Sequence, residues 1–155
     1  MKHIEKSVLI WFSAQEMFAL VADVPKYPEI LPWCASAQVL HTHADGVTAQ
    51  LGMKLGPVAH AFRTRNTHSL PSQTHGEHGL TLALTDGPFS ALSGQWKFVP
   101  VGNAAQRACR VSLTLSYEFS GPALAALLGP LFDTMMASLV DAFVERAETV
   151  YGDGN

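Results

Sequence analysis

The residues of this sequence that most readily suggest a metal-binding or catalytic role are its histidines, of which there are seven in 155 residues. His41 and His43 lie two positions apart, so in a strand they would share one face. Four others fall in a second strand-like segment or near a turn: His60, His68, His75 and His78. None has the helical i, i+4 spacing of a zinc protease motif, and no cysteine pair accompanies them. Solvated strand and loop histidines are therefore a better interpretation than a metal site.

The two cysteines, Cys34 and Cys109, are too few for a disulfide framework and match no zinc spacing. Cys34 lies beside Trp33, but nothing in the sequence supplies the His or Asn partner that activates a thiol, so we expect a buried and inert one. There is also no Gly-rich phosphate loop, no nucleophile elbow and no carboxylate pair in the strand-like segments. We therefore expect a protein that is not an enzyme.

Arg63 and Arg65 lie two positions apart and would share one face of a strand. Inside a cavity such a side chain could bind the polar headgroup of a ligand, because a guanidinium carries several fixed donors. Burial of an unpaired charge is costly, however. The alternative is that both arginines point outward into water.

The composition predicts one domain, residues 1–155, with a substantial core. Hydrophobic residues make up 48% of the chain and charged residues only 15%, which is enough apolar material to line an internal pocket as well. The net charge is −3, from 10 basic and 13 acidic side chains. Such a balance gives no attraction toward a polyanion, so we expect no DNA partner.

The first elements are a strand and a capped helix. His3–Trp11 alternates as a strand does. Ser13 and Glu16 have the spacing of a capping box, which predicts a helix over Ala14–Ala22. The proline-rich Pro25–Cys34 permits at most one helical turn, so we expect a short helix or ordered loop that closes one end of the domain.

Successive antiparallel strands follow, and Asp45-Gly46 is a strong hairpin signal between the first two. With the first strand of the chain they make seven: Ala35–Thr42, Val47–Leu55, Val58–Ser69, His75–Thr85, Leu92–Val101 and Arg107–Phe119. We expect the connections at Gly56-Pro57, around Gln73, at Asp86-Gly87-Pro88 and at Gly102-Asn103.

Ala123–Tyr151 has apolar residues at steps of three and four, which predicts a long helix after Pro122 that stops at Gly152. Gly129-Pro130 predicts a kink or restart within it. A helix of this kind must cover the apolar face of the sheet, which gives an α+β domain. The space between a curved sheet and such a helix is a common ligand site.

Four segments resemble those of the coenzyme Q-binding START family, in the same order. They are Asp23–Cys34 (DVPKYPEILPWC), Phe62–Asn66 (FRTRN), Asp86–Phe98 (DGPFSALSGQWKF) and Phe143–Ala147 (FVERA). The resemblance covers essentially the whole chain. It implies the helix-grip fold of START and Bet v 1-like domains, in which a curved antiparallel sheet clasps the C-terminal helix. The departure from the family pattern is Gly129-Pro130.

The resemblance implies binding of ubiquinone or a related lipid, with no required cofactor, in support of respiration. The ligand tail is expected along Phe132, Met135, Met136 and Leu139, and the mouth of the site at Leu31, Trp33, Phe89 and Trp96. The other candidate ligand-binding residues are Phe62, Arg65, Leu92 and Phe143. Arg65 is preferred to Arg63 because the family segment includes it. Ordinary helix core is the alternative for the helical residues, and cyclase-like activity stays open because related domains include cyclases.

The rival function that the resemblance implies is that of a ribosome-association toxin of the RatA type, which binds the large ribosomal subunit and blocks subunit joining. The basic residues are spread through the chain, with Arg107 and Arg110 the best candidates to converge. The N-terminus lacks the apolar core of a signal peptide, and no apolar run reaches about 20 residues. We expect a cytoplasmic protein, with transient contact to the inner membrane.

Overall fold

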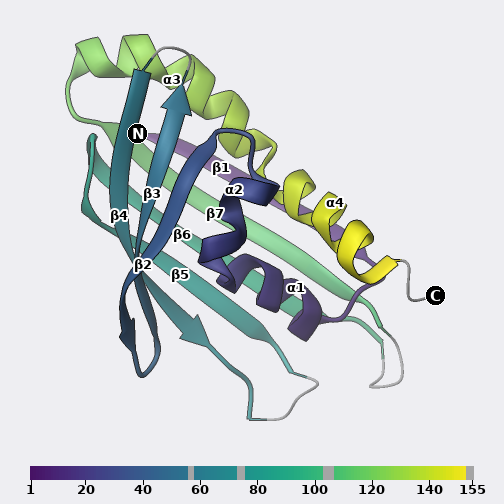
Figure 1. The fold of residues 1–155 in the computed structure, drawn as a ribbon. Helices are drawn as coiled ribbons and strands as arrows, with labels where there is room; N and C mark the ends of the chain where they lie inside the picture. The colour runs from purple at the N-terminus through teal and green to yellow at the C-terminus, as the bar shows by residue number, and fades with distance from the viewer. Residues whose placement is uncertain (56–57, 73–75, 103–106, 153–155) are drawn as a thin grey trace.

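The computed structural model describes residues 1–55, 58–72, 76–102 and 107–152. Seven antiparallel strands form one sheet in the order β1-β7-β6-β5-β4-β3-β2 (Figure 1). The strands are β1 (Lys2–Ile10), β2 (Cys34–His43), β3 (Gly46–Leu55), β4 (Val58–Ser69), β5 (His78–Asp86), β6 (Phe89–Pro100) and β7 (Cys109–Phe119). The first strand therefore pairs with the last, and the predicted α+β helix-grip architecture is confirmed.

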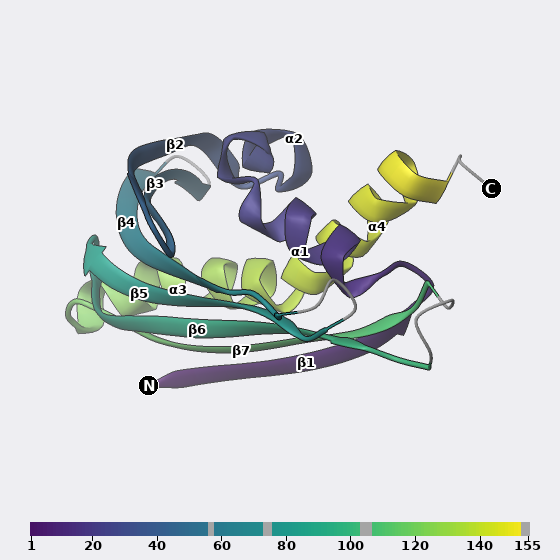
Figure 2. The same ribbon diagram turned by 90° about the horizontal axis from the view of Figure 1, so that it is seen from below.

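The helices all lie on one side of this sheet, which curls around them (Figure 2). They are α1 (Ala14–Ala22), the 3-10 turn η1 (Val24–Lys26), α2 (Tyr27–Ile30), α3 (Pro122–Ala137) and α4 (Leu139–Tyr151). The register shifts within the β2–β3, β4–β5 and β6–β7 pairs. Irregularities of this kind bend and twist a strand, which suits a sheet that must wrap around helices.

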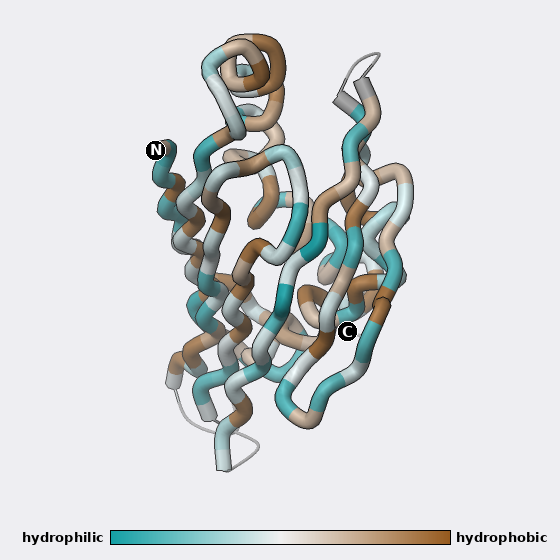
Figure 3. The backbone as a smooth tube through the Cα atoms, turned by 90° about the vertical axis from the view of Figure 1, so that its left-hand side faces the viewer, coloured by the Kyte–Doolittle hydropathy of each residue, from teal (hydrophilic) through white to brown (hydrophobic). Residues whose placement is uncertain are grey.

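Hydrophobic and hydrophilic residues alternate along parts of the strands, as the changes of colour along the tube in Figure 3 show. Because successive residues of a strand point to opposite faces of the sheet, this alternation separates an inner face from an outer one. In β7 the buried residues are Cys109, Val111, Leu113, Leu115, Tyr117 and Phe119. Between them, Arg110, Thr114 and Glu118 are exposed on the outer face. The core is therefore the layer between the concave face and the helices.

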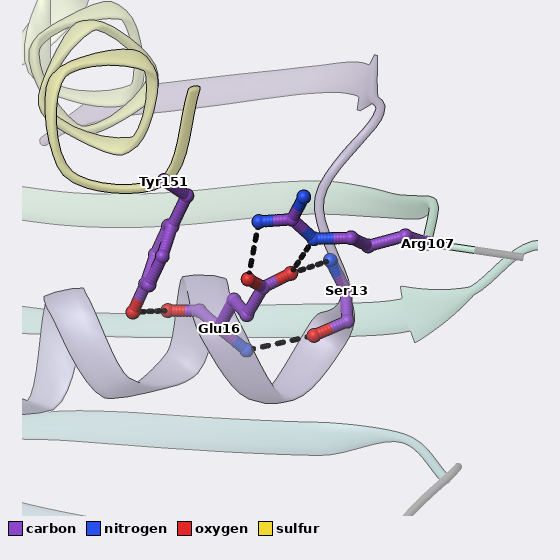
Figure 4. A network of polar contacts seen from close by, with 4 residues as sticks. All are labelled: Ser13, Glu16, Arg107 and Tyr151. Atoms are coloured by element: carbon purple, nitrogen blue, oxygen red, sulfur yellow. Dashed lines mark hydrogen bonds and ion pairs between the residues drawn. The ribbon is translucent and has the colours of Figure 1, made fainter. Parts of the chain in front are cut away.

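The capping box predicted for α1 is present. The Glu16 amide donates to Ser13 Oγ at 3.0 Å, and the Ser13 amide donates to Glu16 Oε1 at 2.8 Å. The Arg107 guanidinium donates two hydrogen bonds to the same Glu16 carboxylate (Figure 4). The Tyr151 hydroxyl donates to the Glu16 backbone carbonyl at 3.2 Å. The start of α1, the end of α4 and Arg107, two residues before β7, are thus tied together.

The C-terminal helix is not broken where the sequence predicted. α3 runs through Gly129 and Pro130, and the Thr134 hydroxyl donates to the Pro130 carbonyl at 3.1 Å. The break is at Ser138, whose amide and hydroxyl both donate to the Met135 carbonyl, at 3.2 and 2.9 Å. A serine that bonds to nearby backbone competes with the helical ladder, and this one ends α3.

α3 and α4 meet at an angle of 40°. Within the described residues, neither helix alone has the length and hydropathy to cross a bilayer, whereas the bent pair passes that test by length and composition.

Some predicted boundaries were wrong by a few residues. β6 begins at Phe89 rather than Leu92, and β7 at Cys109 rather than Arg107. The turn before β6 is tight, because Gly87 has a φ of +150° and a Cβ there would lie 2.6 Å from that of Phe62. β5 begins at His78, whereas the sequence predicted His75, which lies outside the described residues. The connections predicted at Gly56-Pro57, Gln73 and Asn103 lie outside them as well.

Candidate ligand-binding site

A cavity of about 60 Å³ lies between the concave face of the sheet and the helices. Nine of its lining residues are among the twelve that the sequence proposed: Leu31, Trp33, Phe62, Leu92, Trp96, Phe132, Met136, Leu139 and Phe143. Helical spacing explains part of this set, since Phe132 and Met136 in α3, and Leu139 and Phe143 in α4, are each four residues apart. The cavity thus lies where the sequence analysis expected a ligand site.

Eight further lining residues were not proposed from the sequence: Val24, Tyr27, Ala49, Leu51, Thr64, Asn66, Leu82 and Leu115. The alternation of side chains along β4 could have identified two of them, Thr64 and Asn66. Once Phe62 is assigned to the inner face of β4, Thr64 and Asn66 must lie on that face as well. The others lie on strands or turns whose inner face the sequence did not distinguish from plain core.

Arg65 does not line the cavity, and its assignment there is corrected. It lies on the outer face of β4, where Nη2 is 2.6 Å from Asp45 Oδ1 and Nη1 donates to the Asn66 carbonyl at 3.1 Å. Arg63 shares that face, and its Nε donates to Gln50 Oε1 at 2.8 Å. Both arginines point outward because β4 uses the other set of alternate positions, with Phe62, to cover the core.

Phe89 and Met135 also lie outside the cavity lining. Phe89 is buried in a cluster of rings, with its centroid 4.8 Å from that of Phe119 and 5.2 Å from that of Phe132. Met135 is half-buried, because one residue along a helix rotates a side chain by about 100° away from Met136. Both residues support the wall rather than form its surface.

The cavity wall carries one buried polar pair. The Thr64 hydroxyl donates to Asn66 Oδ1 at 2.7 Å, and these residues are only 4% and 3% exposed. The other lining residues with a polar side-chain atom are Tyr27, Trp33 and Trp96. Everything else in the described lining is hydrocarbon or thioether.

Tyr27 is the single titratable residue among the described lining residues. Its hydroxyl donates to the Val21 carbonyl, and burial raises its pKa well above the ordinary value. The described lining contains no Asp, Glu, His, Lys or Arg. It therefore offers no group that would exchange a proton near neutral pH.

Cys34 is buried beside the cavity wall without lining it, which confirms the expectation of a buried thiol. Its Sγ donates to the Ser36 carbonyl at 3.2 Å, and burial raises its pKa. A thiol in this state is a poor nucleophile. Among the described residues, no group of three or more His, Cys, Asp and Glu side chains could hold a metal ion.

The expectation of solvated histidines was wrong for His78 and incomplete for His68. His78 is 6% exposed, and its Nδ1 lies 3.1 Å from the Gly76 carbonyl. His68 is half-buried, and burial lowers its pKa. Both rings contact Phe18 of α1, with centroids 5.2 and 5.3 Å away, because α1 packs on β5 and β6 and the Phe18 ring extends to His68 of β4 as well.

A larger hollow of about 520 Å³ lies between α3 and the ends of β1 and β7. It includes charged residues, with Lys2 Nζ 3.3 Å from Asp133 Oδ2, while Asp133 Oδ1 accepts a hydrogen bond from the Tyr117 hydroxyl. None of the residues proposed from the sequence lines it. For an apolar ligand the inner cavity is the better site despite its size, because its wall is uncharged and shielded from water.

A family model described as "Polyketide cyclase / dehydrase and lipid transport" matches residues 10–144. "Ribosome association toxin RatA" of Pseudomonas aeruginosa is 38% identical over 150 residues, which span 97% of this chain and 98% of that protein. "Coenzyme Q-binding protein COQ10 homolog B, mitochondrial" of Xenopus laevis is 28% identical over 154 residues, which span 97% of this chain and 61% of that protein.

Solved structures show the same fold. A START superfamily protein from Mycobacterium smegmatis superposes with a TM-score of 0.75 at 20% identity, over 96% of this chain and 98% of that one. The Zhui aromatase/cyclase from a Streptomyces species gives a TM-score of 0.74 at 15% identity, over 99% and 98% of the two chains. These similarities extend over the sheet and the C-terminal helices alike.

Proposed function

The chain belongs to the polyketide cyclase, dehydrase and lipid transport family, and on that premise we propose that it binds a hydrophobic molecule between sheet and helices without transforming it. The observation that carries this proposal is the wall of the inner cavity, which is apolar except for a few neutral polar groups. Burial of apolar ligand surface against such a wall is favourable by about 25 cal/mol per Å². The ligand that we propose is a quinone of the ubiquinone type or a related lipid, in keeping with the name of the Xenopus relative.

The cavity must enlarge to hold such a ligand. Its volume of about 60 Å³ is well below the roughly 300–1,000 Å³ of typical ligand pockets. The break at Ser138 lies between Met136 and Leu139, which both line the cavity. We propose that α3 pivots at this break and so widens the cavity, with α4 held in place by its tie to α1.

A binding role is favoured over a catalytic one by the chemistry of the wall. General acid–base catalysis would need a group that moves a proton near neutral pH, and in the described lining only Tyr27 titrates, with its pKa raised by burial. We therefore propose a carrier or chaperone for a quinone used in respiration. A cytoplasmic location with transient membrane contact fits this role, and α3 presents Leu127 and Leu131 to solvent at 62% and 46% exposure.

Native mass spectrometry of protein produced in cells that contain quinones tests the proposal. We expect a bound species whose mass matches one quinone or lipid per chain. The delipidated protein should then regain that species on addition of a short-tailed ubiquinone. Recovery of protein without ligand, together with no binding of the added quinone, would contradict the proposal.

A second function is favoured by a specific observation, the 38% identity with the P. aeruginosa ribosome association toxin over nearly the full length of both chains. On this alternative the protein binds the large ribosomal subunit. The charge distribution argues against recognition of RNA phosphates, because within the described residues at least six of the ten basic side chains form ion pairs: Lys2, Lys6, Lys26, Arg65, Arg107 and Arg146. We therefore propose that any such contact is made with ribosomal protein.

Sucrose-gradient sedimentation after overproduction separates the two functions. A ribosome-associated protein should migrate with the large subunit and reduce the share of intact ribosomes. If the ratio of subunits to intact ribosomes stays normal and the protein remains at the top of the gradient, the ribosome function is excluded for this chain.

A further inference from the structure

Asn66 presents a buried amide to the inner cavity. It lies in the middle of β4, where its Cα pairs with that of Val47 on one side and Leu82 on the other. The residue is only 3% exposed, and it lines the cavity together with Leu82. A primary amide carries two N–H donors and one carbonyl acceptor, all of which favour a hydrogen-bond partner when buried.

Thr64 fixes the orientation of this amide. Its hydroxyl donates to Asn66 Oδ1 at 2.7 Å, so the acceptor end of the amide is occupied and held toward Thr64. The side-chain hydrogen bond that Asn66 makes within the described part of the chain uses Oδ1, which leaves Nδ2 for another acceptor. A ligand that displaced water from this donor without replacing its hydrogen bond would lose about 1–3 kcal/mol. A ligand with an acceptor atom at this place would satisfy the donor.

The remainder of the wall restricts what that acceptor can be. No charged side chain occurs among the described lining residues, so a carboxylate or phosphate would enter without a counter-charge. Burial of an unpaired ion is far more costly than burial of a neutral carbonyl. Hydrocarbon alone would leave the Asn66 donors unsatisfied.

We propose that Asn66 is the polar anchor of this cavity and selects ligands whose buried end is a neutral hydrogen-bond acceptor, such as the ring carbonyl of a quinone. Asn66 Nδ2 donates to that carbonyl, and Thr64 acts as a positioning residue that keeps the donors aimed at the ligand. This inference rests on the proposed binding function. It adds to that function a requirement on the chemistry of the ligand.

The test compares two probes on the full chain: a ubiquinone analogue with a two-isoprene tail and the isoprenoid hydrocarbon of the same tail length. Their affinities are measured by displacement of the neutral fluorophore N-phenyl-1-naphthylamine. Asn66→Leu removes the amide with little change of size. Gln50→Leu is the matched control, because it removes an amide from the outer face, where Gln50 accepts from Arg63.

We expect Asn66→Leu to bind the quinone about tenfold more weakly than the wild type and the hydrocarbon within about twofold. Gln50→Leu should match the wild type with both probes. Equal losses for both probes, or an unchanged quinone affinity, would overturn the role of Asn66. If the wild type binds neither probe, the proposed function fails, which is a distinct result.

A second measurement, by NMR, uses the wild-type protein and so does not depend on whether a variant folds. The chain has only three asparagines, so the side-chain amide of Asn66 can be assigned in a ¹⁵N-labelled sample. We expect the quinone to move one of its amide protons downfield and the hydrocarbon to leave both unchanged. Saturation with quinone without such a shift would overturn the inference.

Discussion

The guanidinium of Arg107 forms two parallel hydrogen bonds with the carboxylate of Glu16, from Nε at 2.7 Å and from Nη2 at 2.6 Å (Figure 4). The same guanidinium lies over the rings of Phe12 and Tyr151, at 5.3 and 5.9 Å from their centroids. Glu16 also closes the capping box of α1. The Glu16–Arg107 pair therefore connects the first helix, the last helix and the segment just before β7.

We expect Arg107→Ala to lower the free energy of unfolding by about 1 kcal/mol, because a bidentate pair is lost at a partly exposed position. Glu16→Ala should cost about 2 kcal/mol, since it removes the cap of α1 as well. Urea denaturation measures both. The control is Lys26→Ala, which breaks the exposed pair with Glu29 at 3.5 Å and should cost less than about 0.5 kcal/mol. Equal costs for all three variants would contradict this account.

The pair should also make stability depend on pH. The hydrogen bond from Arg107 holds the pKa of Glu16 below its ordinary value of 4.5. The unfolded state then binds more protons between the two pKa values, so this contribution is full above pH 4.5 and is lost as the pH falls through the folded pKa. Thermal melts from pH 7 to 3 should show a steeper loss for the wild type than for Arg107→Ala. Parallel curves would argue against this contribution.

His68 should add a separate loss of stability as the pH falls below 6.5, which begins at a higher pH than the loss from Glu16. Burial lowers its pKa from 6.5, and its Nε2 is buried with no hydrogen-bond partner in the described chain. Its contribution is therefore present above pH 6.5 and is lost as the pH falls through the lower folded pKa. His68→Phe keeps a ring against Phe18 and should flatten the decline in melting temperature between pH 7 and 5. His41→Phe, on an exposed strand position, should keep the wild-type slope.

Filling the cavity should abolish ligand binding without unfolding the protein. Ala49 is 1% exposed and lines the cavity from β3, so Ala49→Phe would occupy the space that the ligand needs. We expect at least about a tenfold loss of quinone affinity and a change in unfolding free energy of about 1–3 kcal/mol from overpacking. The control is Ala83→Phe on the exposed face of β5, which should bind as the wild type does. Undiminished binding by a folded Ala49→Phe variant would place the ligand elsewhere.

The sequence alone determined the order of the elements and most of their boundaries. Ser13 and Glu16 predicted the start of α1 to the residue, and Asp45-Gly46 predicted the hairpin between β2 and β3. These features are local, because a cap or a tight turn depends on residues within a few positions of one another. The family resemblance, carried by four segments, added the helix-grip topology.

The sequence analysis predicted nine of the residues that line the cavity, but in β4 it proposed Arg65 as the polar lining residue instead of Asn66. Alternation requires Arg65 and Asn66 to lie on opposite faces, yet it does not say which face meets the helices. The structure shows that the face with Phe62 and Asn66 turns inward, and that Asp45 from the neighbouring hairpin pairs with Arg65 outside.

Only the tertiary structure decided where the last helix bends and which histidines are buried. Pro130 is tolerated inside α3, whereas Ser138 breaks the helix between two residues that line the cavity. His78 is buried because α1, more than fifty residues earlier in the chain, lays Phe18 against it. Such outcomes depend on contacts between segments that are remote in sequence, and packing free energy there outweighs local preference.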